Sequence, residues 1–210
     1  MLQSNTRLAT AALLFGGTLG LSADAHASVV GIPGNSSTAQ LSLAYVYETS
    51  ASFGAWGSPM DGSVSFSDAT YGSISCTQFT AGGFSLSINS TAAANNQSFF
   101  VTQSFTTSDA VNVSLSGFAP VSSSNIALTL CNSDGSLGAF IFQTSDAGSF
   151  SFSGQLAATT GGQYYRFLFT SAASAATSGT LFDLSFTAVP APGAAALVGL
   201  AGLMSRRRRA

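Results

Sequence analysis

The stretch Ser149-Phe150-Ser151-Phe152-Ser153 alternates serine with phenylalanine. Successive side chains of a β-strand point to opposite faces, so an apolar residue at every second position predicts a strand with one buried face. The same period of two recurs along the chain and makes β-structure the dominant prediction. It is found in residues 63–67, 84–88, 111–115, 126–130 and 182–186.

Further strands are predicted in residues 41–47, 139–142 and 165–169, and turn signals such as Asp134-Gly135 and Gly161-Gly162 separate the runs. Regular short strands without a helical period predict an all-β fold, an antiparallel β-sandwich with a jelly-roll-like arrangement. The polar positions carry hydroxyl and amide side chains and almost no charge. We expect this body to cover residues 28–187 and to be flanked by a helix at each end.

Residues 1–27 have the three parts of a secretory signal peptide. Arg7 supplies a positive start, residues 8–21 are apolar, and Ala25-His26-Ala27 is a small-residue cleavage site before Ser28. The pattern predicts an exported protein that signal peptidase cuts. A buried N-terminal helix of the body is the other interpretation of this apolar segment.

Residues 188–210 also form a tripartite segment. A proline motif is followed by a short apolar helix candidate and then by a basic cluster, which would hold the end of a membrane-inserted helix on the cytoplasmic side. The proline motif is Val189, Pro190, Ala191, Pro192 and Gly193, and the cluster is Arg206, Arg207, Arg208 and Arg209.

This order resembles the PEP-CTERM family of bacterial sorting tails, although Ala191 stands where that family usually has glutamate. The resemblance covers about the last 22 residues. It implies transient membrane anchoring, processing by an exosortase-type transpeptidase, and a cell-surface or extracellular location associated with exopolysaccharide or biofilm. The alternative is a membrane anchor that is never cleaved, because hydropathy does not separate the two.

The residue inventory between the two end segments excludes several classes of function. Residues 28–189 contain seven acids and one base, Arg166, which gives a net charge of −6. Nucleic-acid binding needs clustered Lys or Arg, so no nucleic-acid partner is expected. This part of the chain has no His and no Lys, which removes Ser-His-Asp triads, His-ligated zinc and Schiff-base lysines. We therefore expect no enzyme, no metal and no cofactor.

The two cysteines, Cys76 and Cys131, are a disulfide candidate, because an exported protein passes through an oxidising compartment. The strand periodicity conflicts with this pairing. Cys76 shares the core-facing parity of Ile74, whereas Cys131 has the opposite parity to Leu128. Two unpaired thiols are the alternative.

Trp56 lies in a glycine-rich segment and is a possible ligand contact, although it could equally cap the end of the sandwich. The strand tyrosines Tyr45, Tyr47, Tyr164 and Tyr165 are more typical of core or cross-strand contacts. Arg166 and Asp183 have outward parity in two strands that could form a hairpin, which predicts a cross-strand ion pair.

These observations favour a non-enzymatic surface or matrix protein whose uncharged hydroxyl and amide surface contacts hydrated polysaccharide. The first alternative is a carbohydrate-binding module, or an adhesin with an uncleaved anchor. The second is a glycan hydrolase or lyase, which would need two carboxylates facing one cleft, roughly 5–10 Å apart.

Overall fold

The structure is a computed structural model that describes residues 28–32, 38–43, 63–94, 96–122 and 124–189. These residues form twelve strands and no helix, as the alternation predicts. The strands are β1 (Val29–Gly31), β2 (Thr38–Ser42), β3 (Val64–Asp68), β4 (Gly72–Cys76), β5 (Gly83–Ser90), β6 (Gln97–Thr107), β7 (Val111–Ala119), β8 (Asn125–Cys131), β9 (Leu137–Thr144), β10 (Gly148–Leu156), β11 (Tyr164–Ala173) and β12 (Ser178–Ala188).

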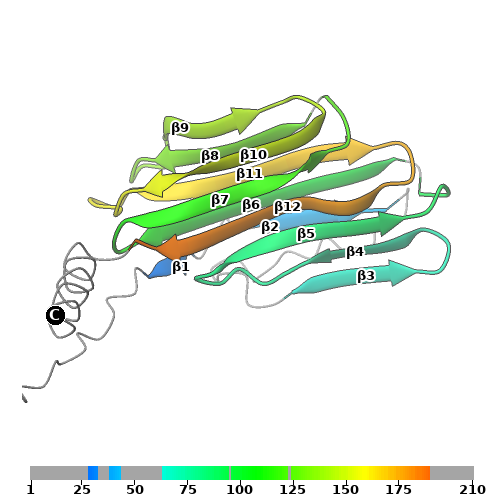
Figure 1. Cartoon of the computed structure of the whole chain (residues 1–210), viewed down its shortest axis with the longest axis horizontal. Coiled ribbons are helices and arrows are strands. Elements are labelled where there is room, and N and C mark those ends of the chain that lie inside the picture. Colours follow the sequence, from blue (N-terminus) through cyan, green and yellow to red (C-terminus); the bar gives the residue numbers. More distant parts are fainter. Residues whose placement is uncertain (1–27, 33–37, 44–62, 95, 123, 190–210) are drawn as a thin grey trace, which may run out of the picture.

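The strands make two antiparallel sheets that lie face to face (Figure 1). The first sheet has the order β1-β6-β11-β8-β9, and β2 also pairs with β6. The second sheet has the order β10-β7-β12-β5-β4-β3. From β5 onward the chain passes from one sheet to the other at every connection except β8–β9. Neighbouring strands in a sheet are therefore mostly distant in sequence.

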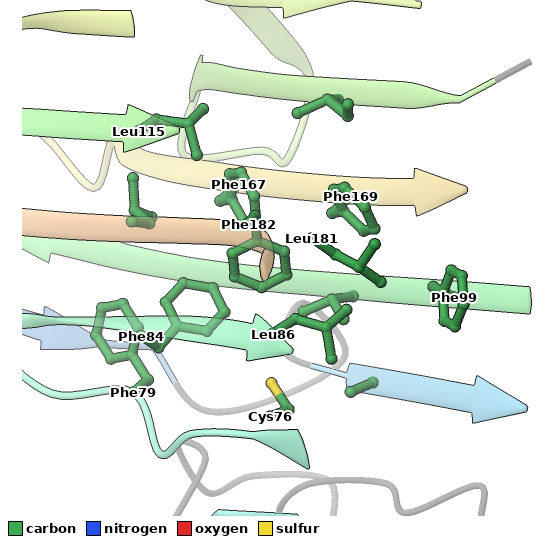
Figure 2. Close-up of a cluster of buried hydrophobic side chains, with 14 of the residues drawn as sticks. Cys76, Phe79, Phe84, Leu86, Phe99, Leu115, Phe167, Phe169, Leu181 and Phe182 are labelled. Carbon is green, nitrogen blue, oxygen red and sulfur yellow. The ribbon is translucent and has the colours of Figure 1, made fainter. Parts of the chain in front are cut away.

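The core between the sheets is built largely from phenylalanine rings (Figure 2). Phe167 of the first sheet packs between two rings of the second, with ring centroids 5.6 Å from Phe84 and 4.8 Å from Phe182. Phe105 meets Phe186 in the same way, at 4.9 Å. Each fully buried ring contributes roughly 2–3 kcal/mol of hydrophobic stabilisation. These contacts close the sandwich.

The burial pattern agrees with the predicted period of two in several strands but not in β8, where the predicted outward residues Ala127 and Thr129 are also buried. In β11, buried and half-buried residues alternate without interruption, and β7 alternates in the same way from Val111 to Leu115. The turn between β8 and β9 also forms where Asp134-Gly135 predicts it. Gly135 has φ +84°, a left-handed conformation that favours glycine, and the Asp134 carboxylate accepts the backbone N–H of Ser136 at 2.9 Å.

The described structure differs from the sequence predictions at β6 and β2 and does not include the predicted flanking helices. The longest first-sheet strand, β6, was not predicted, because the inward positions Gln97 and Gln103 interrupt its apolar pattern. The predicted strand 41–47 is observed as β2, which starts earlier, and its residues after Leu43 lie outside the described residues. The predicted flanking helices, in residues 1–27 and 190–210, also lie outside them. Within the described parts of the chain, no helix could cross a membrane.

Candidate functional site

The outer surface of the second sheet is a broad, almost uncharged array of hydroxyl and amide side chains, here called the hydroxyl face. Its polar members occupy outward positions of all six strands, and the Phe118 ring of β7 lies exposed among them. They are Ser65, Ser67, Ser73, Ser75, Ser85, Ser87, Asn89, Asn112, Ser114, Ser116, Ser149, Ser151, Ser153, Gln155, Thr180, Asp183, Ser185 and Thr187.

Strand register aligns these side chains in rows across the sheet. One row crosses four strands and contains Ser151, Ser116, Asp183 and Ser85. The next row crosses three strands and contains Ser153, Ser114 and Ser185. Adjacent strands are ~4.8 Å apart and alternate residues on one strand ~6.6 Å apart, so the rows form a regular lattice of small polar groups.

A shallow hollow of about 390 Å³ lies on this face, over β10, β7 and β12. Its polar lining comes from Asn112, Ser114, Ser153, Ser185 and Thr187. Hydroxyl and amide groups both donate and accept hydrogen bonds. The hollow can therefore match a ligand that is itself rich in hydroxyl groups.

The electrostatics of the hydroxyl face are set by a single acid. Among the described residues of the face, Asp183 is the only ionisable one. A neutral ligand can therefore bind there without desolvating more than one charge, and desolvation of charges is the costly part of polar recognition. The face suits a neutral, hydrated partner better than a phosphate-rich or strongly ionic one.

The outer surface of the first sheet has a different chemistry, centred on Arg166 of β11. The guanidinium Nη2 donates a hydrogen bond to the Tyr164 hydroxyl at 2.7 Å, and its carbon lies 5.4 Å from the Tyr164 ring centroid. Leu137 and Phe140 of β9 are exposed, at 57% and 51%. This surface combines one cation with apolar and aromatic groups.

The predicted ion pair between Arg166 and Asp183 is wrong. Arg166 lies on the outer face of the first sheet, whereas Asp183 lies on the outer face of the second. The segment between β11 and β12 crosses from one sheet to the other instead of forming a hairpin. The whole thickness of the sandwich therefore separates the two charges.

The predicted disulfide is also wrong, because both cysteines are free and buried. Cys76 of β4 points into the core beside Leu86 (Figure 2). Cys131, at the end of β8, has outward parity in the other sheet and faces Tyr164. Burial raises the pKa of the Cys76 thiol to about 12 and also raises the pKa of Cys131. Both thiols are therefore protonated at neutral pH.

The carboxylates of the described residues are dispersed. Asp68, Asp109, Asp134 and Asp146 lie at four separate turns, while Asp183 lies on the hydroxyl face. Asp68 accepts the backbone N–H groups of Thr70 and Tyr71. Hydrogen bonds from Ser136 lower the pKa of the Asp134 carboxyl. Within the described ranges no group of three or more His, Cys, Asp or Glu side chains could hold a metal ion.

Several predicted site residues lie outside the described residues. They are Trp56, the cleavage residues Ala25 and Ala27, the motif residues from Pro190 to Gly193 and the four terminal arginines. Ser28 is described, and its backbone N–H donates to the Ser108 hydroxyl at 3.0 Å. Strand β12 ends at Ala188, one residue before Val189 of the proline motif.

Comparison with known proteins adds no identification. No protein-family model matches the chain, and neither the curated proteins nor the solved structures compared with it include a match.

Proposed function

We propose that this chain is an exported, non-enzymatic surface or matrix protein that contacts hydrated polysaccharide through its hydroxyl face. One observation carries the proposal. Small neutral hydroxyl and amide groups cover most of the outer face of a six-stranded sheet, Phe118 is exposed among them, and Asp183 is the only charge among the described residues of the face. The side chains of such a surface can both donate hydrogen bonds to and accept them from a polymer that carries a hydroxyl group on every repeating unit.

The end segments of the sequence support the proposed location. The tripartite segment 1–27 is typical of export by signal peptidase processing. The tail from residue 188 resembles PEP-CTERM tails, which are substrates of exosortase-type transpeptidases. A protein processed in this way would reach the cell surface or the extracellular matrix, where exopolysaccharide is the abundant polymer.

The strand order supports the finer fold assignment. The eight strands β5 to β12 are arranged as β5-β12-β7-β10 in one sheet and β6-β11-β8-β9 in the other. We infer from this order a jelly roll, in which two Greek keys alternate between the sheets. The dispersal of the described carboxylates over separate turns supports a binding role over a glycan hydrolase or lyase.

The proposal is tested by cosedimentation of the full-length chain with the matrix polysaccharide of its own host. The Ser114→Glu/Ser185→Glu variant places two charges in the hollow, and we expect it to lose binding. Asn125→Glu adds a charge to an exposed strand position of the first sheet and serves as the matched control. Equal binding by all three proteins, or none by the unmodified chain, would reject the hydroxyl face as the contact surface.

A second candidate is a carbohydrate-binding module, or an adhesin with a retained anchor, that uses the first sheet. Arg166 favours this candidate, because its guanidinium donates a hydrogen bond to the Tyr164 hydroxyl and no described carboxylate forms an ion pair with it. An arginine beside an aromatic ring suits an acidic sugar. This candidate predicts salt-sensitive binding that Arg166→Gln abolishes, whereas binding through the hydroxyl face would be insensitive to both changes.

A further inference from the structure

Strand β10 is a free edge of the second sheet among the described residues. It pairs with β7 on one side, over nine residues from Gly148 to Leu156 and without a bulge. Its other side carries the unpaired backbone N–H and C=O groups of an edge strand. Such edges are usually protected by charged side chains, proline or bulges, because they template pairing with another chain. None of these protections occurs in β10.

The sequence of this edge is a palindrome. Gly148-Ser149-Phe150-Ser151-Phe152-Ser153-Gly154 reads the same in both directions about Ser151. An antiparallel pair of two such strands, centred on Ser151, places Ser149 opposite Ser153 and Phe150 opposite Phe152. Residues of equal parity oppose each other in this register. Both strands therefore turn matching sets of free N–H and C=O groups toward one another.

We propose that two copies of the chain associate through β10, antiparallel, about a two-fold axis at Ser151. The association extends the second sheet across both copies in the order β12-β7-β10-β10-β7-β12. Serines of the two copies then lie on one continuous hydroxyl face. The half-buried rings of Phe150 and Phe152 meet their counterparts on the inner side of the junction. Such isologous pairing is the commonest form of homodimer symmetry.

The charges nearest to the junction do not oppose this arrangement. The two Asp146 residues would lie at opposite ends of the paired strands, about 33 Å apart at ~3.3 Å per residue. The two Asp183 residues would be five strand spacings apart, or about 24 Å. Both separations exceed the Debye length of ~10 Å at 0.1 M salt. A chain with a negatively charged body can therefore self-associate at this edge.

Disulfide trapping tests the register directly. In the full-length chain, Ser151→Cys places two thiols on directly opposed residues, whose Cα atoms are ~4.5–5.5 Å apart and within disulfide reach. We expect a disulfide-linked dimer on mild oxidation. Ser149→Cys alone should not cross-link, because its two copies lie about 13 Å apart along the strands. A mixture of Ser149→Cys and Ser153→Cys should cross-link. The native thiols of Cys76 and Cys131 are buried, so the unmodified chain should give no cross-linked dimer and serves as the control.

The second measurement introduces a charge at position 151 and determines the dimer dissociation constant of the full-length chain by analytical ultracentrifugation. Ser151→Lys puts two like charges opposite each other and should raise the dissociation constant about fivefold or more at low salt. Mixing Ser151→Lys with Ser151→Asp should restore association, and Ser114→Lys, on the neighbouring strand, should leave it unchanged. The proposal is overturned if folded Ser151→Cys gives no dimer, if Ser149→Cys cross-links as well alone as in the mixture, or if Ser151→Lys and Ser114→Lys associate equally.

Discussion

The ring of Phe150 lies against the backbone of Gly117, the residue directly opposite it on β7. A Cβ atom on Gly117 would lie 2.5 Å from the Phe150 ring and 2.2 Å from the carbonyl oxygen of Leu181. The backbone carbonyl cannot move as a side-chain end can. The absence of a side chain at position 117 therefore allows the edge strand and its neighbour to pack together.

Gly117→Ala should lower the free energy of unfolding by about 1–3 kcal/mol, because the added methyl overpacks this contact. Urea titration followed by circular dichroism measures the change. Ser116→Ala alters the adjacent residue on the exposed hydroxyl face and should change stability by less than ~0.5 kcal/mol. Equal stability of the two variants would show that the sheet can relax around the new methyl.

The buried side chain of Gln97 links the segment before β6 to the segment between β11 and β12 by hydrogen bonds. Its side-chain Nε2 donates to the Ala94 carbonyl at 2.7 Å and to the Ala175 carbonyl at 2.9 Å, and the residue is 1% exposed. Gln97→Glu removes both donors and buries a carboxylate against two carbonyl oxygens. We expect a loss of at least ~2 kcal/mol at pH 7.

The pH dependence of this variant provides a second test. Burial raises the pKa of the new carboxyl in the folded state, so the loss should shrink as pH falls toward ~4, where the unfolded carboxyl also binds a proton. Gln155→Glu introduces the same group at an exposed position of β10 and is the control. If Gln97→Glu lowers the free energy of unfolding equally at pH 7 and pH ~4, the new carboxylate is not buried.

The thiol of Cys76 makes stability depend on pH in the alkaline range. Its folded pKa of about 12 exceeds the unfolded value of about 9. Between these values the folded state holds a proton that the unfolded state has released, so stability falls as pH rises from about 9 toward about 12. Cys76→Ala should remove this component, and denaturation at pH 8 and pH 10 measures it.

The same buried thiols predict a reagent-accessibility pattern. Without reductant, a thiol reagent at pH 8 should label neither Cys76 nor Cys131 in the folded chain, and should label both after unfolding. Labelling of neither residue after unfolding would mean that the two are disulfide-bonded, contrary to the structure.

Arg166 should be coupled energetically to Tyr164 and not to Asp183. A double-mutant cycle of Arg166→Gln with Tyr164→Phe should give a coupling energy of about 0.5–1.5 kcal/mol, because it removes a 2.7 Å hydrogen bond. The cycle with Asp183→Asn should give a value near zero, since the two residues lie on opposite faces. A larger coupling to Asp183 than to Tyr164 would contradict the sheet assignment of these strands.

Local periodicity was enough to locate most strands but not to assign them to sheets. The alternation around Phe84 and Phe186 marks inward positions correctly, because each of these strand segments buries mainly one face. The strand β6 was missed, since Gln97 occupies an inward position, where its side chain donates to the nearby Ala94 carbonyl and to the Ala175 carbonyl, which is distant in sequence. A polar residue with such tertiary partners carries no local signal.

The hydroxyl face shows the same limit at the level of the site. The sequence indicates polar, uncharged outer positions, but it does not show that Ser85, Ser116 and Ser151 belong to one row. That row depends on the pairing of β5, β12, β7 and β10, which register fixes across a separation of more than sixty residues. The sequence also failed to place Arg166 on the opposite surface from Asp183. The β11–β12 connection resembles a hairpin turn in sequence, whereas it crosses between the sheets.

The position of β12 also determines when the chain can fold. This strand lies between β5 and β7 in the second sheet, yet it is synthesised after all the other described strands and ends at Ala188. Neither half of that sheet can join the other until residue 188 is free of whatever synthesises or transports the chain. Topologies dominated by such long-range pairs fold in milliseconds to seconds rather than microseconds. Until β12 inserts, β5 and β7 both remain open edges, and this interval is when the chain most needs protection from aggregation.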